Sequence, residues 1–209
     1  MSIYEFATLQ AGTSAAPKAT GALDEYLRSQ ANRGTLLGCW ISEIGALNRI
    51  ALLRRYDDTA SHDAERERLL SSGDPFGCGA HLTGMSLDRC VPFPNVPEPE
   101  LGRFGPYYEI RTYEMETGGL EPTLATWAKA VPVRRERSHL VTVLRTVEGA
   151  PRMVSIWPYP TIEDRQTIRA QAIADGIWPP KDSYKHLKNN PDYISVIEQQ
   201  EKEINEKSY

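Results

Sequence analysis

The sequence predicts an α+β protein made of two copies of one domain, because the chain of 209 residues repeats itself. Residues 3–10 (IYEFATLQ) match residues 107–114 (YYEIRTYE), with a Tyr-Glu pair and a threonine in common. Residues 45–56 match residues 149–159 at nearly the same spacing, with one residue dropped near Asn48. Self-similarity at a domain-sized period indicates duplication. The sequence therefore contains two related domains in tandem.

A proline-rich segment separates the two copies and sets the domain boundaries. Residues 92–106 contain five prolines, a density that disfavours both helix and sheet and predicts a stiff, extended connector. We assign residues 1–97 and 106–209 to the two domains and residues 98–105 to the linker. Each domain, at roughly 100 residues, is long enough to bury its own core.

The second copy shows its elements clearly, and the residue pattern justifies them in chain order. Alternating aromatic and β-branched residues predict a strand at 107–114, after which two glycines turn the chain. Apolar residues at helical spacing predict a helix from Leu120 that ends at Pro132. Two further strands and a capped helix follow by the same criteria, at residues 140–147, 152–157 and 161–175.

The first copy repeats this order, with predicted strands at 3–9, 36–43, 49–54 and 87–93 and helices at 22–30 and 59–70. Strand-helix-strand-strand-helix-strand is the ferredoxin-like order. The second copy shows no obvious last strand. In its place, residues Pro191–Asn205 predict a terminal helix that covers a sheet edge or docks on a partner. Its apolar stripe consists of Ile194, Ile197 and Ile204.

These elements predict two tandem ferredoxin-like domains, each an antiparallel sheet with both helices on one face. The other face of each sheet is bare and must be buried. Two copies in one chain can pack their bare faces together into a pseudo-symmetric α+β barrel with a pocket inside. Because one sheet edge lacks a covering strand, we also expect the protein to form homodimers.

Charge and composition disfavour several classes of function. A net charge of −4 and a pI near 5.7 argue against binding to nucleic acid or to an anionic membrane. The strongest basic cluster, residues 134–137 (RRER), follows a proline and contains a carboxylate, so a solvated loop is favoured over a phosphate site. No apolar run approaches the ~20 residues of a membrane span, and no signal pattern opens the chain. A cytoplasmic protein is expected.

Cysteine usage points to a reducing compartment and gives no support for a metal site. Cys39, Cys78 and Cys90 are an odd number without the spacing of a disulfide framework. Cys78 and His81 have the C-x-x-H spacing, but no second pair of ligands lies nearby to complete a zinc site. The sequence also contains no phosphate loop, dinucleotide fingerprint or nucleophile elbow. We therefore expect neither a metal nor a cofactor.

Several motifs resemble those of the NIPSNAP family. They are the strand 108–113 (YEIRTY), the helix with Trp127, the hairpin 149–159 (GAPRMVSIWPY), and Gly45, Asn48, Arg49 and Tyr56 of the first copy. The resemblance implies a dimeric α+β barrel, in a superfamily that also includes cofactor-free monooxygenases, haem degraders and small isomerases. It implies no particular reaction. The sequence departs from the family pattern at Ala7, Leu9, Leu52, Arg54 and Ser155.

Strand alternation places the candidate site residues on shared faces. In the strand 107–114, the face with Tyr108 is more apolar and should pack on the helices, which turns the other face toward the barrel interior. That interior face should carry Tyr107, Glu109, Arg111 and Tyr113, joined by Met153, Ser155 and Trp157 from the returning strand. An aromatic cavity with a few polar groups is typical of a small-molecule site.

Glu109, Arg111 and Tyr113 are the catalytic candidates. Glu109 can act as a general base if burial raises its pKa, and Arg111 can hold a carboxylate or enolate oxygen. The alternative is that Glu109 and Arg111 form an ion pair that only stabilises the sheet. The ligand-binding candidates are Glu5, Tyr107, His139, Met153, Ser155 and Trp157.

Glu5 and His139 are included for separate reasons. Glu5 is the first-copy counterpart of Glu109, and two carboxylates that face one cavity would shift each other's pKa. His139 begins a strand, where a hydrogen bond at the strand end is its alternative role.

Together, these observations predict a protein that binds a small apolar or aromatic-acid molecule inside its barrel. If it is an enzyme, a cofactor-free isomerase or oxygenase is favoured. The alternative is a non-catalytic scaffold that uses its charged C-terminal helix to dock on other proteins. A closed, dry barrel would favour the scaffold, and an open polar cavity would favour the ligand-binding protein.

Overall fold

The computed structural model of the protein describes residues 2–29, 31–96, 98–99, 101–188 and 192–199. The strands are β1 (Ile3–Ala11), β2 (Thr35–Gly45), β3 (Arg49–Tyr56), β4 (Leu82–Pro92), β5 (Tyr107–Glu114), β6 (Thr142–Thr146), β7 (Arg152–Tyr159) and β8 (Asp192–Gln199). The α-helices are α1 (Ala16–Arg28), α2 (Thr59–Ser71), α3 (Leu120–Arg135) and α4 (Ile162–Ala174).

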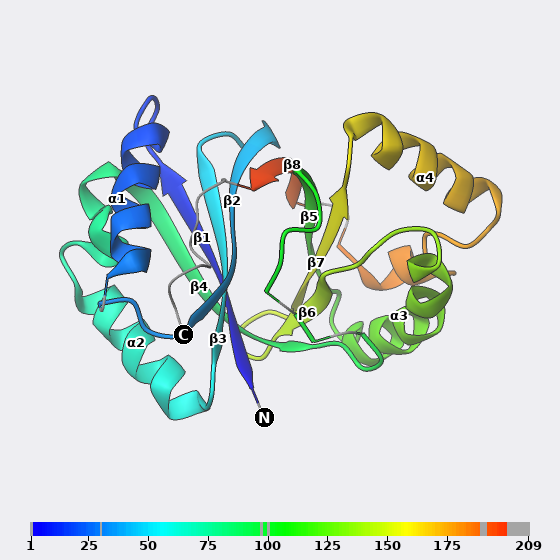
Figure 1. The fold of residues 1–209 in the computed structure, drawn as a ribbon. Coiled ribbons are helices and arrows are strands. Elements are labelled where there is room, and N and C mark those ends of the chain that lie inside the picture. The colour runs from blue at the N-terminus through cyan, green and yellow to red at the C-terminus, as the bar shows by residue number, and fades with distance from the viewer. Residues whose placement is uncertain (1, 30, 97, 100, 189–191, 200–209) are drawn as a thin grey trace.

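The strands form one closed antiparallel barrel in the order β1-β3-β2-β8-β5-β7-β6-β4. Each copy contributes its strands in the same relative order, as β4-β1-β3-β2 and β8-β5-β7-β6. The two halves join where β2 pairs with β8 and β4 pairs with β6. Figure 1 shows α1 and α2 on one side of the strands and α3 and α4 on the other. The predicted fold class is confirmed, and the barrel closes within a single chain.

Three apolar cores hold the barrel and its helices together. The first fills the barrel with side chains from both halves, including Trp40 and Tyr108, whose ring centroids lie 5.5 Å apart. The second core lies between the first-half strands and helix α1, and the third lies between the second-half strands and helices α3 and α4. Burial of these apolar surfaces is the main source of stability. The described side chains inside the barrel therefore form an apolar core, whereas the prediction placed a polar pocket there.

The two strands of the predicted site face the opposite way from the prediction. Tyr108 and Ile110 belong to the barrel core, as do Val154 and Ile156 of β7, whereas Trp157 packs under the helices. The prediction assigned the more apolar strand face to the helices. The barrel encloses its inner face on all sides, so that face carries the more apolar residues, while polar side chains line gaps under the helix layer.

The C-terminal segment is a strand where the sequence predicted a helix. Residues Asp192–Gln199 form β8, which pairs with both β2 and β5. Pairing two open edges satisfies many backbone N–H and C=O groups at once, and this outweighs the helical spacing of Ile194 and Ile197. Ile204 and the rest of the expected helix lie outside the described residues. Strand β8 covers the sheet edge whose exposure was the reason to expect a homodimer. Dimerisation stays a prediction without that support.

Helix α3 continues through Pro132 to Arg135, whereas the sequence predicted an end at the proline. Proline removes one hydrogen-bond donor from a helix, but the apolar face of α3 packs on the sheet across this position. Arg134 lies on the same helix face as Trp127 and Val131, and all three side chains are buried. The expected solvated loop is therefore wrong for Arg134, whose residue is only 1% exposed.

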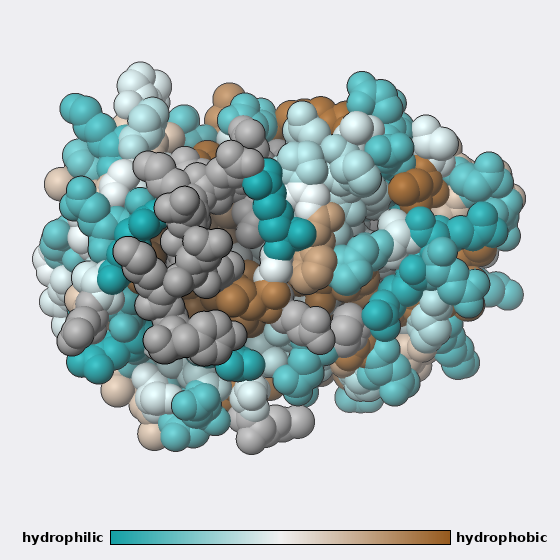
Figure 2. Space-filling view, viewed as in Figure 1, coloured by the Kyte–Doolittle hydropathy of each residue, from teal (hydrophilic) through white to brown (hydrophobic). Residues whose placement is uncertain are grey.

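Hydrophilic residues cover most of the helix-bearing flanks on the face shown in Figure 2. Of the helices within the described ranges, none combines the length and the apolar character needed to cross a membrane.

Candidate functional site

A cavity of about 230 Å³ lies between the second-half sheet and its helices. Strands β5 and β7, helices α3 and α4, and the segment 178–187 supply its walls. Its lining includes five of the predicted site residues, namely Glu109, Arg111, Tyr113, Ser155 and Trp157. In the β5–β7 pairing, Glu109 lies opposite Trp157 and Arg111 lies opposite Ser155, so these side chains share one sheet face. The predicted catalytic set thus comes together, but on the helix side of the sheet.

The carboxylate of Glu109 is surrounded by three arginines. Arg111 Nη2 lies 2.5 Å from its Oε1, Arg165 Nε donates to the same oxygen at 3.0 Å, and Arg169 Nη1 lies 3.3 Å from Oε2. The Glu109 side chain is only 1% exposed. Arg111 also donates to the hydroxyl of Tyr113 at 3.0 Å. Glu109 is therefore a buried anion held by charge-assisted hydrogen bonds.

These contacts decide the protonation state of Glu109. Burial by itself would raise its pKa, but the positive charges of Arg111, Arg169 and Arg165, with the hydrogen bond from Arg111, lower the pKa overall. For Arg111, burial acts to lower the pKa and the charge of Glu109 raises it overall. The general-base role required burial to raise the pKa of Glu109, so the local charges argue against that role.

Arg134 enters the cavity from the last turn of α3. Its guanidinium carbon lies 4.9 Å from the ring centroid of Trp157 and 5.9 Å from that of Trp178. Arg134 donates to Ser138 Oγ at 2.6 Å and to the Tyr159 hydroxyl at 3.4 Å. No carboxylate among the described residues pairs with it, and burial lowers its pKa. Arg134 is thus a buried cation without an anionic partner.

The charges around the cavity do not balance. Among the described residues that line it, three are arginines, Arg111, Arg134 and Arg169, and one is a carboxylate, Glu109, which leaves an excess of two positive charges. Arg165 contacts Glu109 from outside this lining. Such an excess at a partly desolvated site favours an anionic ligand.

Aromatic rings and unpartnered polar atoms complete the lining. Trp178 makes edge-on contacts with Trp127 and Trp157, at centroid distances of 4.9 Å and 5.5 Å. The indole Nε1 of Trp127 and the hydroxyl of Ser155 are buried without a hydrogen-bond partner in the described structure. Unsatisfied buried polar groups are uncommon. The cavity can therefore offer two further hydrogen-bond donors to a ligand.

Four predicted site residues lie elsewhere. Tyr107 is half-buried at the start of β5 and does not line the cavity. Met153 belongs to the core under the helices. His139 is exposed and stacks on Phe104 at a centroid distance of 4.4 Å. Glu5 contacts helix α2 in the first half, so it shares no cavity with Glu109, and the predicted pair of facing carboxylates is wrong.

Sequence reasoning missed Arg134, Arg169 and Trp178, which all line the cavity. Arg134 was missed because the sequence predicted that the helix ends at Pro132, which placed Arg134 in a solvated loop. Arg169 lies four residues after Arg165 on α4, and this helical spacing was the available signal for a basic face.

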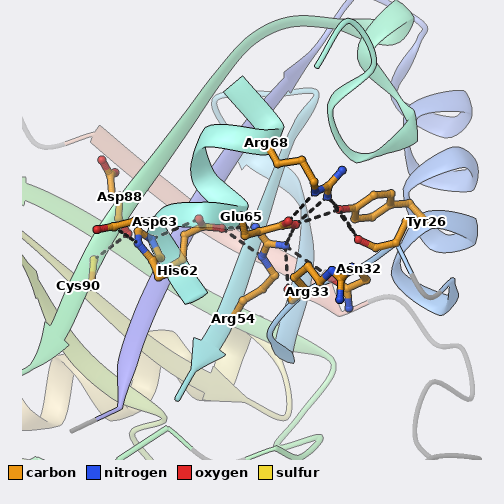
Figure 3. A network of polar contacts seen from close by, with 12 residues as sticks. Tyr26, Asn32, Arg33, Arg54, His62, Asp63, Glu65, Arg68, Asp88 and Cys90 are labelled. Atoms are coloured by element: carbon orange, nitrogen blue, oxygen red, sulfur yellow. Dashed lines mark hydrogen bonds and ion pairs between the residues drawn. The ribbon is translucent and has the colours of Figure 1, made fainter. Parts of the chain in front are cut away.

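The first half holds a different polar cluster at the equivalent place. Arg54 Nη2 lies 2.5 Å from Glu5 Oε1, and His62 Nε2 lies 3.5 Å from Glu5 Oε2. Arg54 Nη1 also lies 3.3 Å from Glu65 Oε1, which accepts from Arg68 Nη2 at 2.9 Å. Figure 3 shows this network running between helix α2 and the strands beneath it. The side chains of Glu5, Arg54 and His62 are fully buried, whereas Arg68 is 43% exposed, and Glu65 and Arg68 line a separate cavity of about 570 Å³.

The network lowers the pKa of Glu5. Burial acts to raise it, but the contact with His62 and the charge of Arg54 prevail. Among the residues that the structure describes, no group of three histidine, cysteine or acidic side chains is placed to hold a metal ion.

Comparisons with known proteins agree with the fold. The model of the NIPSNAP family matches residues 4–75 and 108–206. The protein NipSnap homolog of Dictyostelium discoideum is 25% identical over 156 residues, covering 70% of this chain and 67% of that relative.

Two solved structures superpose over nearly the whole chain. One, described as an anthrone oxidase-like protein, has a TM-score of 0.64 at 11% identity and covers 96% of this chain and 92% of its own. The other, a candidate monooxygenase from Lactobacillus acidophilus NCFM, has a TM-score of 0.62 at 9% identity, with coverages of 94% and 92%. At these identities the likeness shows a shared fold alone.

Proposed function

The chain belongs to the NIPSNAP family, and we propose that it binds a small aromatic carboxylate in the second-half cavity. The observation that carries this proposal is Arg134, a buried guanidinium beside the rings of Trp157 and Trp178 with no carboxylate partner in the described part of the chain. A ligand carboxylate would supply that partner through two parallel hydrogen bonds. Its ring would then lie against the tryptophans.

The size of the cavity limits the ligand. Its volume of about 230 Å³ is below the roughly 300–1,000 Å³ of pockets for drug-sized molecules. A single aromatic ring with short substituents suits this volume. The ring would contact Trp127, Trp157 and Trp178 through the edge and face geometries that aromatic pairs prefer.

Any catalysis would depend on the guanidinium groups. Arg111 and Arg134 would stabilise an enolate or phenolate oxygen formed on the ligand, as preorganised cations do in oxyanion sites. Glu109 would hold Arg111 in place, since its lowered pKa makes it a weak base. The fold neighbours are described as an anthrone oxidase-like protein and a candidate monooxygenase, and this analogy of fold favours an oxygenase among the possible reactions.

A non-catalytic scaffold stays the alternative. The apolar core inside the barrel favours it, although residues Asp192–Gln199 of its expected docking helix form a barrel strand. The polar cavity under the second-half helices favours the ligand-binding protein.

Isothermal titration calorimetry with benzoate and phenylacetate, beside their neutral amides, tests the proposal. We expect the acids to bind saturably and the amides to bind at least tenfold more weakly. Arg134→Gln should weaken binding of the acids by about 10–100-fold, because a hydrogen bond to a charged group contributes roughly 1.5–3 kcal/mol. Arg135→Gln is the matched control, since Arg135 is the next residue along and is exposed.

Two results would contradict the proposal. One is equal affinity for acid and amide in the native protein. The other is unchanged acid binding by the Arg134→Gln variant while its thermal unfolding stays like that of the native protein.

A further inference from the structure

The second-half cavity carries more positive charge than one carboxylate can balance. A bound monocarboxylate would pair with Arg134 and still leave one of the two excess positive charges of the lining uncompensated. We infer that the natural ligand is a dianion, an aromatic ring with two acidic groups, of which one binds Arg134 and the other binds Arg169. This inference rests on the proposed function and names its ligand class.

Of the three arginines that contact Glu109, Arg169 makes the weakest contact. Its contact of 3.3 Å is longer than that of Arg111, at 2.5 Å, and it uses the oxygen that neither Arg111 nor Arg165 contacts. Burial lowers the pKa of Arg169, and the shared charge of Glu109 does not reverse this. Arg169 also lines the cavity. A second anionic group on the ligand would therefore compensate the charge of Arg169, while Glu109 keeps its contacts with Arg111 and Arg165.

Arg134 and Arg169 reach one small space from two different helices, α3 and α4. Tyr159 also lines this space, and its hydroxyl accepts from Arg134 Nη2 at 3.4 Å. Because both arginines line a cavity of only about 230 Å³, the two acidic groups of a single-ring ligand can reach both of them. Ser155 and Trp127 can donate to the remaining ligand oxygens.

The test compares aromatic diacids with esters of the same shape. Phthalate, isophthalate and terephthalate are titrated into the native protein by calorimetry at pH 7.5, each beside its monomethyl ester, which keeps one charge. We expect at least one diacid to bind tenfold or more tightly than its ester. Arg169→Gln should reduce that diacid to the affinity of its ester and change the affinity for the ester by less than threefold. Arg134→Gln should weaken both.

The outcomes separate this inference from the proposed function. If the esters bind as tightly as all three diacids, the inference of a dianionic ligand is wrong and the proposed monocarboxylate site stands. If neither diacids nor esters bind, both fail. The comparison of diacid and ester uses native protein, so it holds even where Arg169→Gln unfolds. Arg169→Lys, which keeps the charge, should retain most of the preference for the diacid.

Discussion

Each half of the chain holds a buried glutamate at the matching strand position, and the two glutamates have different surroundings. Helices α2 and α4 both have 13 residues and begin three residues after the matched tyrosines, Tyr56 and Tyr159. Glu5 and Glu109 occupy matching positions on β1 and β5, and both face these helices. In the first half the strand supplies Arg54 as the cation, whereas the matching residue of the second half is Trp157.

The neighbours of the carboxylate decide what each half can do. In the first half, Glu5 and Glu65 meet Arg54 and Arg68, so the charges of these four side chains balance. In the second half, the positions that match Ala7 and His62 are arginines, Arg111 and Arg165. Both contact the carboxylate of Glu109. A few substitutions within one scaffold thus separate a charge-balanced ion network from a cluster with excess positive charge.

Arg54→Met should produce the largest loss of stability. The substitution leaves Glu5 and Glu65 buried with fewer cations, and breaking a buried ion pair from one side typically costs about 3–5 kcal/mol. Guanidinium chloride unfolding monitored by circular dichroism measures the loss. A change below about 1 kcal/mol would mean that the first-half network does not stabilise the fold.

Arg134→Met provides the matched contrast. Because Arg134 has no acidic partner within the described residues, we expect a change in stability within about 1 kcal/mol, in either direction. The same denaturation experiment applies. A loss as large as that of Arg54→Met would show that the two halves do not differ in the way the charges indicate.

His62 should give the first half a pH dependence that the second half lacks. Burial acts to lower its pKa, but hydrogen bonds to Glu5 and Asp63 raise it overall. The protonated ring therefore contributes stability that is fully present below the unfolded pKa of about 6.5 and is lost as pH rises through the raised folded pKa.

Unfolding at pH 6 and pH 9 measures this contribution. The native protein should lose more stability over that interval than His62→Gln does, and His139→Gln, at an exposed position, should behave like the native protein. Identical pH profiles for native protein and His62→Gln would contradict the assignment.

Helix caps should give the smallest effect and the same sign in both halves. Thr161 Oγ1 accepts from the Asp164 N–H at 2.9 Å, and Asp58 Oδ1 accepts from the Ser61 N–H at 2.7 Å. Thr161→Ala should lower stability by about 1 kcal/mol, and Asp58→Ala should also lower it. Thermal unfolding of both variants checks this. A loss in one half alone would show that the caps are not equivalent.

Local patterns in the sequence predicted most elements, but not their relative orientation. Alternation grouped Glu109, Arg111 and Tyr113 on one face, and the structure keeps them together. It could not say whether that face meets the barrel or the helices, because both sides of the sheet are buried in this fold. The β8 strand shows the same limit, since its segment has helical spacing and takes a strand conformation where two strands need a partner.

The sequence by itself determined the duplication, the ferredoxin-like order of the elements and the family. These depend on short-range periodicity and on matching residues, which a single chain displays directly. Only the tertiary structure decided that the barrel interior is an apolar core, that Arg134 is buried and that the cavity lies under α3 and α4. Those features depend on which distant surfaces meet, and charge balance within a cavity exists only once side chains far apart in sequence share the same space.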